Sequence, residues 1–442
     1  MDLQSIAKRR APYYTVGPHP YCDWITDGVA DDVQIQQAID YLDACGGGRI
    51  QLTADTYVLA NQIRVKEDVH IEGITIPYRD RIILADHQIS QFNITNAIDN
   101  AFVMVASSGI ERCGFYYPNQ QTNAAPDVYP ATIKLVNSPS TMIPKDVYIA
   151  ENLAINPYIF CDATVAHERL SFMRNLGSPI SVGLDLDHSS DIDYIEGNHW
   201  NPNFAPHILG INIYNWMIAN SIGFRVGRAD GAKFLNNFTW GYYQGAKFLG
   251  TDMITISSNA FDATPRCIDC VNLTNSRISN NLCYAFDAFN SALPANAVGI
   301  SLEMSAGGGA NNIVSGNTVV SAATGIYSNC PKTVIVGNNV VGFDSICGYN
   351  KGIWCYTSAP RCVISNNFVD GVGHANGGGI VVEATQFVMS GNLIYNCPSS
   401  GFFIVNGLDD YTIVGNVTKT CGGNQYGNGA HKFADTSHNV AD

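Results

Sequence analysis

The sequence predicts an all-β protein, a single-stranded right-handed parallel β-helix with an N-terminal capping helix. Three observations favour this fold class: a helical segment that leads directly into short strands, an asparagine that recurs after apolar pairs, and a second recurring motif that begins with glycine. Of the 442 residues, 46% are hydrophobic and only 14% are charged. This composition excludes a disordered chain and indicates many neutral polar side chains.

The first predicted unit of structure is an entry segment over residues 23–75, which follows an N-terminal extension over residues 1–22. Asp31 and Asp32 can cap a helix, and glycines at 46–48 end it. The apolar residues at helical spacing between them are Ile35, Ala38, Ile39 and Leu42. A helix followed at once by short strands suits the open end of a β-helix, where uncovered strand edges would aggregate.

Residues 76–420 are predicted to form the β-helix, and residues 421–442 a polar C-terminal tail. The recurring asparagines are Asn152, Asn198, Asn237, Asn259, Asn281, Asn317, Asn338, Asn367, Asn392 and Asn416. Many intervals are 21 to 29 residues, about the length of one coil of three short strands and three turns. The longer interval from Asn152 to Asn198 indicates an extra coil or an excursion. We expect each asparagine to adopt a left-handed conformation at a corner and to bond along the stack.

A motif of the form Gly-apolar-x-apolar-x precedes most of these asparagines and predicts the first strand of each coil, with its apolar residues inside. The outward positions form a stripe of Lys134, Asp185, Asp187, Arg225, Lys247, Asp269, Ser301, Glu303, Tyr327, Asn329, Trp354, Tyr356 and Glu383. Because sugar rings stack on aromatic faces, Tyr327, Trp354 and Tyr356 are predicted saccharide subsites, with Trp240 added from a nearby loop. The sequence leaves the register around residues 205–230 open.

Two pairs of carboxylates on the stripe suit glycoside hydrolysis, which requires one acid and one carboxylate. Asp185 and Asp187 lie about 6.5–7 Å apart on one strand, near the lower limit for inverting enzymes. Asp269 and Glu303 would favour a retaining mechanism if they lie on adjacent coils, about 5 Å apart. The first pair is preferred, because a long loop predicted over residues 153–182 should cover it.

Two other functions use the same stripe. In a polysaccharide lyase, Asp185 and Asp187 could hold Ca²⁺, while Arg225, Lys247 or His167 removes the C5 proton of a uronate. In a protein that only binds glycan, the aromatic residues suffice. Hydrolysis requires no cofactor, and Ca²⁺ is expected only for the lyase. In either enzyme, the cations or His167 could also orient an acidic sugar.

Charge and composition narrow the partners. A net charge of −14 argues against nucleic acid, and the sequence lacks an apolar run long enough to span a membrane. The first residues lack the apolar region of a secretory signal, which predicts release by another route or removal of a leader. The 13 cysteines, including Cys267 and Cys270, are expected to be reduced, buried thiols.

The entry segment also resembles a known family. The runs DGVADD at 27–32, IQQAIDYLDACGGGRIQL at 35–52 and VHIEG at 69–73, with Tyr57, are similar to the entry of the pectate-lyase-like (pectin-lyase-like) β-helix superfamily. That superfamily includes polysaccharide lyases, glycosidases, epimerases and bacteriophage tailspikes. The resemblance implies a homotrimer and a tailspike-type depolymerase of surface polysaccharide, extracellular or virion-associated. The lack of a secretory signal favours the tailspike type, because tailspikes are released by lysis.

Overall fold

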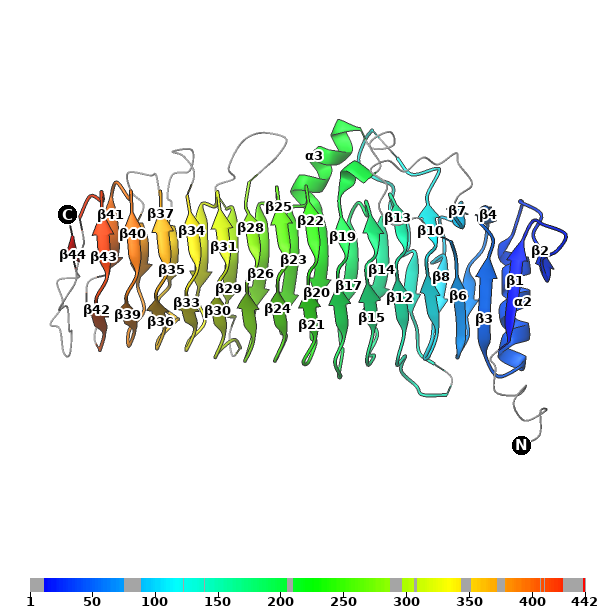
Figure 1. The fold of residues 1–442 in the computed structure, drawn as a ribbon, viewed down its shortest axis with the longest axis horizontal. Coiled ribbons are helices and arrows are strands. Elements are labelled where there is room, and N and C mark those ends of the chain that lie inside the picture. Colours follow the sequence, from blue (N-terminus) through cyan, green and yellow to red (C-terminus); the bar gives the residue numbers. More distant parts are fainter. Residues whose placement is uncertain are drawn as a thin grey trace. The chain divides into compact units, whose positions relative to one another are not determined.

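The structure is a computed structural model (Figure 1). It describes residues 12–74, 89–121, 123–138, 140–204, 210–286, 296–305, 308–342, 351–371, 378–405, 407–408, 410–423 and 440–441. The chain divides into two compact units, Met1–Trp216 and Met217–Asp442. In each unit the strands form three parallel sheets, A, B and C, and each coil contributes one strand to each sheet. The predicted fold class, a right-handed parallel β-helix, is confirmed.

The first unit is described by its strands in sheet order. Sheet A contains β2 (Trp24–Ile25), β1 (Tyr13–Gly17), β3 (Gly48–Leu52), β6 (Val69–Glu72), β9 (Gly109–Glu111), β12 (Tyr148–Ala150), β15 (Ser171–Met173) and β18 (Tyr194–Glu196). Sheet B contains β4 (Thr56–Leu59), β7 (Gln91–Ile94), β10 (Gly114–Tyr116), β13 (Leu153–Ile155), β16 (Leu176–Gly177) and β19 (His199–Trp200). Sheet C contains β5 (Ile63–Val65), β8 (Phe102–Met104), β11 (Ile133–Leu135), β14 (Ile159–Ala163) and β17 (Val182–Leu186).

The second unit repeats this arrangement. Sheet A contains β21 (Lys233–Leu235), β24 (Thr255–Ser257), β27 (Arg277–Ser279), β30 (Ile313–Ser315), β33 (Val334–Val336), β36 (Val363–Ser365), β39 (Val388–Ser390) and β42 (Thr412–Val414). Sheet B contains β22 (Phe238–Trp240), β25 (Ala260–Asp262), β28 (Leu282–Tyr284), β31 (Thr318–Val320), β34 (Asn339–Val341), β37 (Phe368–Asp370), β40 (Leu393–Tyr395), β43 (Val417–Lys419) and β44 (Val440–Ala441). Sheet C contains β20 (Ile222–Val226), β23 (Gln244–Leu249), β26 (Arg266–Val271), β29 (Val298–Glu303), β32 (Thr324–Ser328), β35 (Lys351–Cys355), β38 (Gly378–Val382) and β41 (Ser400–Ile404).

Helix α2 (Asp32–Ala44) packs against the entry strands, and its four predicted apolar residues are buried. Asp31 stands at the N-cap position, but its side chain makes no capping hydrogen bond. Its carboxylate instead accepts hydrogen bonds from the backbone amides of Asp27, Gly28 and Val58. The expectation of a side-chain cap at Asp31 was therefore wrong, because this carboxylate joins the helix start to β4. Most of the predicted tail at 421–442 lies outside the described residues.

The recurring glycines lie near the corner at which most sheet C strands of the second unit begin, where a side chain has little room; β26 has Cys267 at this position. A Cβ atom on Gly325 would lie 2.5 Å from the carbonyl oxygen of Gly352 in the next coil, and one on Gly352 would lie 2.5 Å from that of Gly379. The glycine motif thus follows from the close approach of successive coils. Beyond this corner the strands alternate as predicted, with apolar residues buried and the next residue outward.

The recurring asparagines form ladders of buried side chains. In the second unit, the Nδ2 atoms of Asn317 and Asn338 each donate to the Oδ1 of the next asparagine, at 2.9 and 3.0 Å. The expected bonding along the stack is confirmed. The left-handed residue is the one before the ladder asparagine, such as Asn366 (φ 54°), so the predicted conformation of the asparagine itself was wrong.

Two segments that the sequence left uncertain are now defined. The predicted loop at 153–182 does not exist, because these residues form strands β13 to β17. They supply an extra coil whose ladder residue is Asn175, which accounts for the long interval in the repeat. In the 205–230 region, α3 (Ile211–Asn220) precedes β20, so Arg225 lies on a sheet C strand. Within the described residues, no helix is long and apolar enough to cross a membrane.

Candidate functional site

The outward side chains of sheet C in the second unit lie in columns that the strand register defines. The first column runs through Arg225, Lys247, Asp269, Ser301, Tyr327 and Trp354, each directly paired with the next. Adjacent members are therefore one strand spacing apart, about 4.8 Å. We call the face formed by this column and its neighbouring outward residues the sheet C track. The predicted stripe holds in this unit, so charged and aromatic side chains meet on one surface.

The centre of the track is an arginine held by a buried carboxylate. Arg266 donates to both oxygens of Asp269, at 2.8 and 3.2 Å, and Gln244 donates to Asp269 at 2.6 Å. The Asp269 side chain is 6% exposed, so it has little access to a substrate. Burial lowers the pKa of Arg266, but Asp269 outweighs this effect and holds the pKa above its usual value. Asp269 therefore fixes a charged Arg266 at the surface.

Glu303 is the accessible carboxylate beside this arginine. Its side chain is 45% exposed, and it lies 3.3 Å from Arg266 and 3.2 Å from the Ser301 hydroxyl. Glu303 pairs with Val271 rather than with Asp269, so the two carboxylates are on adjacent coils but two residues out of line. The two carboxylates therefore lie on adjacent coils, as the hypothesis of a retaining mechanism requires, and one terminal nitrogen of Arg266 contacts both, at 2.8 Å from Asp269 and 3.3 Å from Glu303. The retaining mechanism stays a prediction.

The aromatic end of the track is a cluster of three rings. Tyr327 and Trp354 have centroids 5.0 Å apart, and Trp354 and Tyr356 have centroids 5.5 Å apart, both edge to face. Burial and the charge of Glu303 raise the pKa of Tyr327 to about 12. Tyr356 is the most exposed ring and offers the open platform.

Lys351 lies on the Trp354 ring, with its ammonium 2.9 Å from the centroid. Glu383 accepts a hydrogen bond from the indole nitrogen at 2.9 Å and lies 4.0 Å from Lys351. Burial lowers the pKa of Lys351, while Glu383 opposes this shift. One face of Trp354 is thus occupied by the Lys351 ammonium. The ring therefore positions Lys351 in addition to offering a stacking surface.

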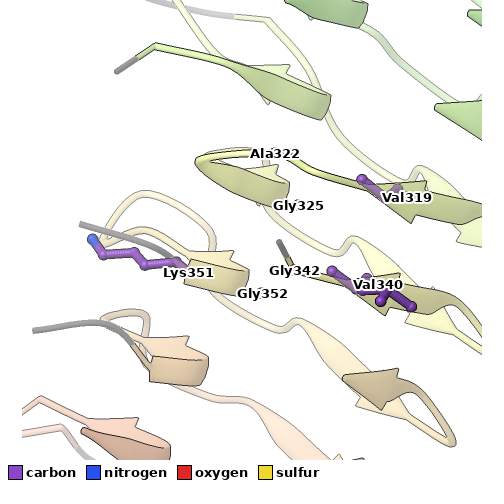
Figure 2. Close-up of a pocket in the computed structure, with 8 residues that line it drawn as sticks. Val319, Ala322, Gly325, Val340, Gly342, Lys351 and Gly352 are labelled. Atoms are coloured by element: carbon purple, nitrogen blue, oxygen red, sulfur yellow. The ribbon is translucent and has the colours of Figure 1, made fainter. Parts of the chain in front are cut away.

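Figure 2 shows the Lys351 side chain extending away from Val319 and Val340, at the edge of a small hollow between sheets B and C. The described residues that line this hollow include two corner glycines, Gly325 and Gly352. The space suffices for about one water molecule, so a sugar would have to bind on the open track.

The track is richer in cations than the chain as a whole. Its charged side chains are the cations Arg225, Lys247, Arg266 and Lys351 and the anions Asp269, Glu303 and Glu383. The excess of positive charge contrasts with the net charge of −14. In the described part of the chain, Lys247 has no ion-pair partner, which leaves its ammonium available to an anion.

Asp185 and Asp187 lie in the first unit, on the outward face of one sheet C segment. Asp185 is in register with Asp162, which forms an ion pair with Lys134 at 3.0 Å. Asp187 lies 3.3 Å from His188. The covering loop that favoured this pair is absent, because its residues form the neighbouring coil. The catalytic role of the pair stays a prediction.

Two predicted binding residues are placed elsewhere. The His167 side chain is 1% exposed and lies 3.1 Å from Asp193, so its predicted contact with substrate was wrong. Trp240 belongs to strand β22 of sheet B rather than to a loop over sheet C. The structure does not bring it into the track.

The structure also identifies site residues that the sequence did not. Gln244, Arg266 and Lys351 occupy the outward position directly before the corner glycine or its equivalent, and the register aligns this position in successive coils. The motif was read only from the glycine onward, so this column was missed. Reading one residue upstream would have found it.

The described residues do not gather three His, Cys, Asp or Glu side chains that could hold a metal ion. Cys267 and Cys270 are buried in β26, and the Cys267 thiol donates to the Thr264 carbonyl at 3.3 Å. The described residues therefore do not fit a copper or zinc centre, whose soft or imidazole ligands must converge.

Sheet topology and the open track define a parallel β-helix protein with a cation-rich outer face. A family model described as NosD, periplasmic copper-binding protein, matches residues 213–421, slightly less than half of the chain. No curated protein sequence matches the chain significantly. The DFA-IIIase of Arthrobacter chlorophenolicus is similar in fold, with a TM-score of 0.52 and 11% identity over 85% of this chain and 93% of that one.

Two further solved structures have lower TM-scores. The A-module of an Azotobacter vinelandii mannuronan C-5 epimerase gives a TM-score of 0.49 at 14% identity, over 95% of this chain and 97% of that one. The tailspike protein of E. coli bacteriophage HK620, in complex with a pentasaccharide, gives 0.42 at 13% identity, over 99% and 68%. At these identities the similarity concerns the fold alone.

Proposed function

We propose that this protein is a polysaccharide depolymerase of tailspike type, which hydrolyses an acidic surface glycan on the sheet C track of the second unit. The observation that carries the proposal is the direct register of Asp269, Ser301, Tyr327 and Trp354, which sets a carboxylate–arginine centre beside a cluster of aromatic rings. Enzymes of carbohydrate chemistry need both a charged centre and apolar ring surfaces.

Each group has a role in this proposal. Glu303 is the catalytic carboxylate, because it is exposed and held by Ser301 and Arg266. Asp269 is a positioning residue that fixes Arg266. Lys247, Lys351 and Arg266 bind the carboxylates of the glycan, and Tyr356 stacks on a sugar ring. A virion location and a homotrimer, which the family resemblance implies, belong to the same proposal.

The test is hydrolysis of acidic glycans by full-length variants, with products measured by mass spectrometry. Glu303→Gln should lower the rate by about 10²- to 10⁴-fold, the usual contribution of a general acid or base, and leave binding nearly unchanged. Tyr356→Ala should weaken binding by roughly tenfold at most. Asp185→Asn/Asp187→Asn is the matched control in the first unit. If only that double variant loses activity, the active site is in the first unit, at Asp185 and Asp187.

The reaction product distinguishes hydrolysis from the two other functions, a lyase reaction and glycan binding alone. A lyase would release an unsaturated sugar that absorbs ultraviolet light, and Lys247, which has no ion-pair partner among the described residues, suits neutralisation of a uronate during that reaction. Inhibition by a chelator would support a role for Ca²⁺. If the wild-type protein binds glycan and cleaves none, the proposal is reduced to binding.

A further inference from the structure

A groove on sheet A of the first unit is unrelated to the sheet C track. Its volume is about 350 Å³, within the range of small-ligand pockets. It is lined by Asp146, Val147, Tyr148, Arg169, Ser171, Asp191, Ile192 and Tyr194. They belong to the coils that carry β12, β15 and β18, and all except the buried Val147 are partly or fully exposed.

The register makes this groove a slot between two tyrosines. Tyr148 pairs with Ser171, and Ser171 pairs with Tyr194, so the tyrosines lie two coils apart with a small residue between them. The backbones of their two strands are therefore about 9.6 Å apart. Tyr194 is 45% exposed. The Ser171 hydroxyl has no hydrogen-bond partner within the part of the chain that the structure describes.

The chemistry of the two rings favours a sugar as the ligand. A tyrosine ring offers an apolar face on which the C–H surface of a sugar ring can stack, and its hydroxyl can bond to a sugar hydroxyl. The serine at the floor leaves space for the ring and offers a hydroxyl to it.

The end of the slot is polar and slightly acidic. Arg169 lies 2.6 Å from Asp146 and 3.0 Å from both Asp191 and Glu168. Hydrogen bonds to Arg169 lower the pKa of Asp146, and a backbone amide together with Arg169 lowers that of Asp191. These carboxylates stay ionised and can accept hydrogen bonds from sugar hydroxyls, but they would repel an anionic sugar.

We propose that this groove is a second saccharide site, which holds one neutral sugar ring of a glycan between Tyr148 and Tyr194. The site goes beyond the proposed catalytic track and differs from it in charge preference. The sheet A groove would take a neutral sugar, whereas the sheet C track would take an acidic one.

The experiment measures binding of neutral oligosaccharides and of oligouronates to the full chain by calorimetry. The Glu303→Gln background prevents cleavage, so a failed active-site assignment and a failed groove assignment give different results. Tyr194→Ala should weaken neutral-sugar binding at least tenfold. Ser171→Trp, which fills the slot at the surface, should abolish it. Tyr116→Ala, on sheet B of the same unit, is the control and should bind as before.

Three results would overturn the proposal. One is the absence of neutral-sugar binding by the parent protein, and another is unchanged binding in both Tyr194→Ala and Ser171→Trp. The third is a lower oligomeric mass of Ser171→Trp in light scattering, because the groove would then be an interface between copies of the chain.

Discussion

At the scale of single residues, His167 is a polar side chain that is buried inside a coil and bonded on both ring nitrogens. Its Nδ1 faces the Val165 carbonyl at 2.8 Å, and its Nε2 faces Asp193 at 3.1 Å. Both partners accept hydrogen bonds, so the protonated ring, which donates from both nitrogens, satisfies both contacts. Burial alone lowers the pKa of His167, but the hydrogen bond and charge of Asp193 outweigh it and raise the pKa above its usual value.

This pair predicts a pH dependence of stability. The pKa of His167 is higher in the folded protein than the value of about 6.5 expected in the unfolded chain. The protonated histidine therefore stabilises the fold fully below about pH 6.5, and this stabilisation is lost as the pH rises through the folded-state pKa. Asp193→Asn should therefore flatten the fall in melting temperature between neutral and alkaline pH. Circular dichroism of both proteins across that range measures the difference. His188→Gln, at an exposed histidine, should keep the parent profile. An unchanged slope in Asp193→Asn would contradict the assignment.

At the scale of elements, the asparagine ladder supplies the hydrogen bonds of the corners between sheets A and B. Asn338 accepts from the amide and side chain of Asn317 and donates to the Val314 carbonyl at 3.0 Å. Its neighbour in sequence, Asn339, is exposed at the start of β34. The two positions share a residue type and a coil but differ in burial.

Asn338→Ala should lower the free energy of unfolding by about 3 kcal/mol, because it leaves buried donors and acceptors without partners. Asn339→Ala should change it by less than about 0.5 kcal/mol, as is usual at exposed positions. Urea denaturation followed by tryptophan fluorescence compares the two variants. Equal changes in the free energy of unfolding would show that the ladder hydrogen bonds do not stabilise the protein.

At the scale of the whole molecule, the cysteines of the described residues are all free, and ten of these twelve are buried. Burial raises the pKa of several of these thiols, for example to about 12 for Cys330, and it shields the buried thiols from reagents in solution. Cys45 is exposed, and Cys421 is half-buried.

An alkylating reagent should therefore modify Cys45 in the native protein and the ten buried cysteines only after unfolding. Peptide mass spectrometry resolves each site, including Cys347, which lies outside the described residues. A reducing agent should leave the melting temperature unchanged. A lower melting temperature in reductant would reveal a disulfide.

Much of the fold was predictable because its signals are local and repeat in every coil. Corner glycines recur where a carbonyl of the next coil approaches closely, and the asparagines recur where a corner amide needs an acceptor. For the same reason the sequence predicted that Tyr327 and Trp354 share a face. The sequence could not distinguish a loop from a coil over residues 153–182, because the glycine and asparagine motifs are incomplete there.

The sequence by itself determined the β-helix, its entry helix and the outward position of most site residues, since these depend on periodicity along the chain. Only the tertiary structure decided which outward residues touch. Glu303 lies two residues out of register with Asp269 but shares Arg266 with it, and burial removes His167 from contact with a substrate. Such contacts depend on how neighbouring coils align, and no pattern within a single coil contains that information.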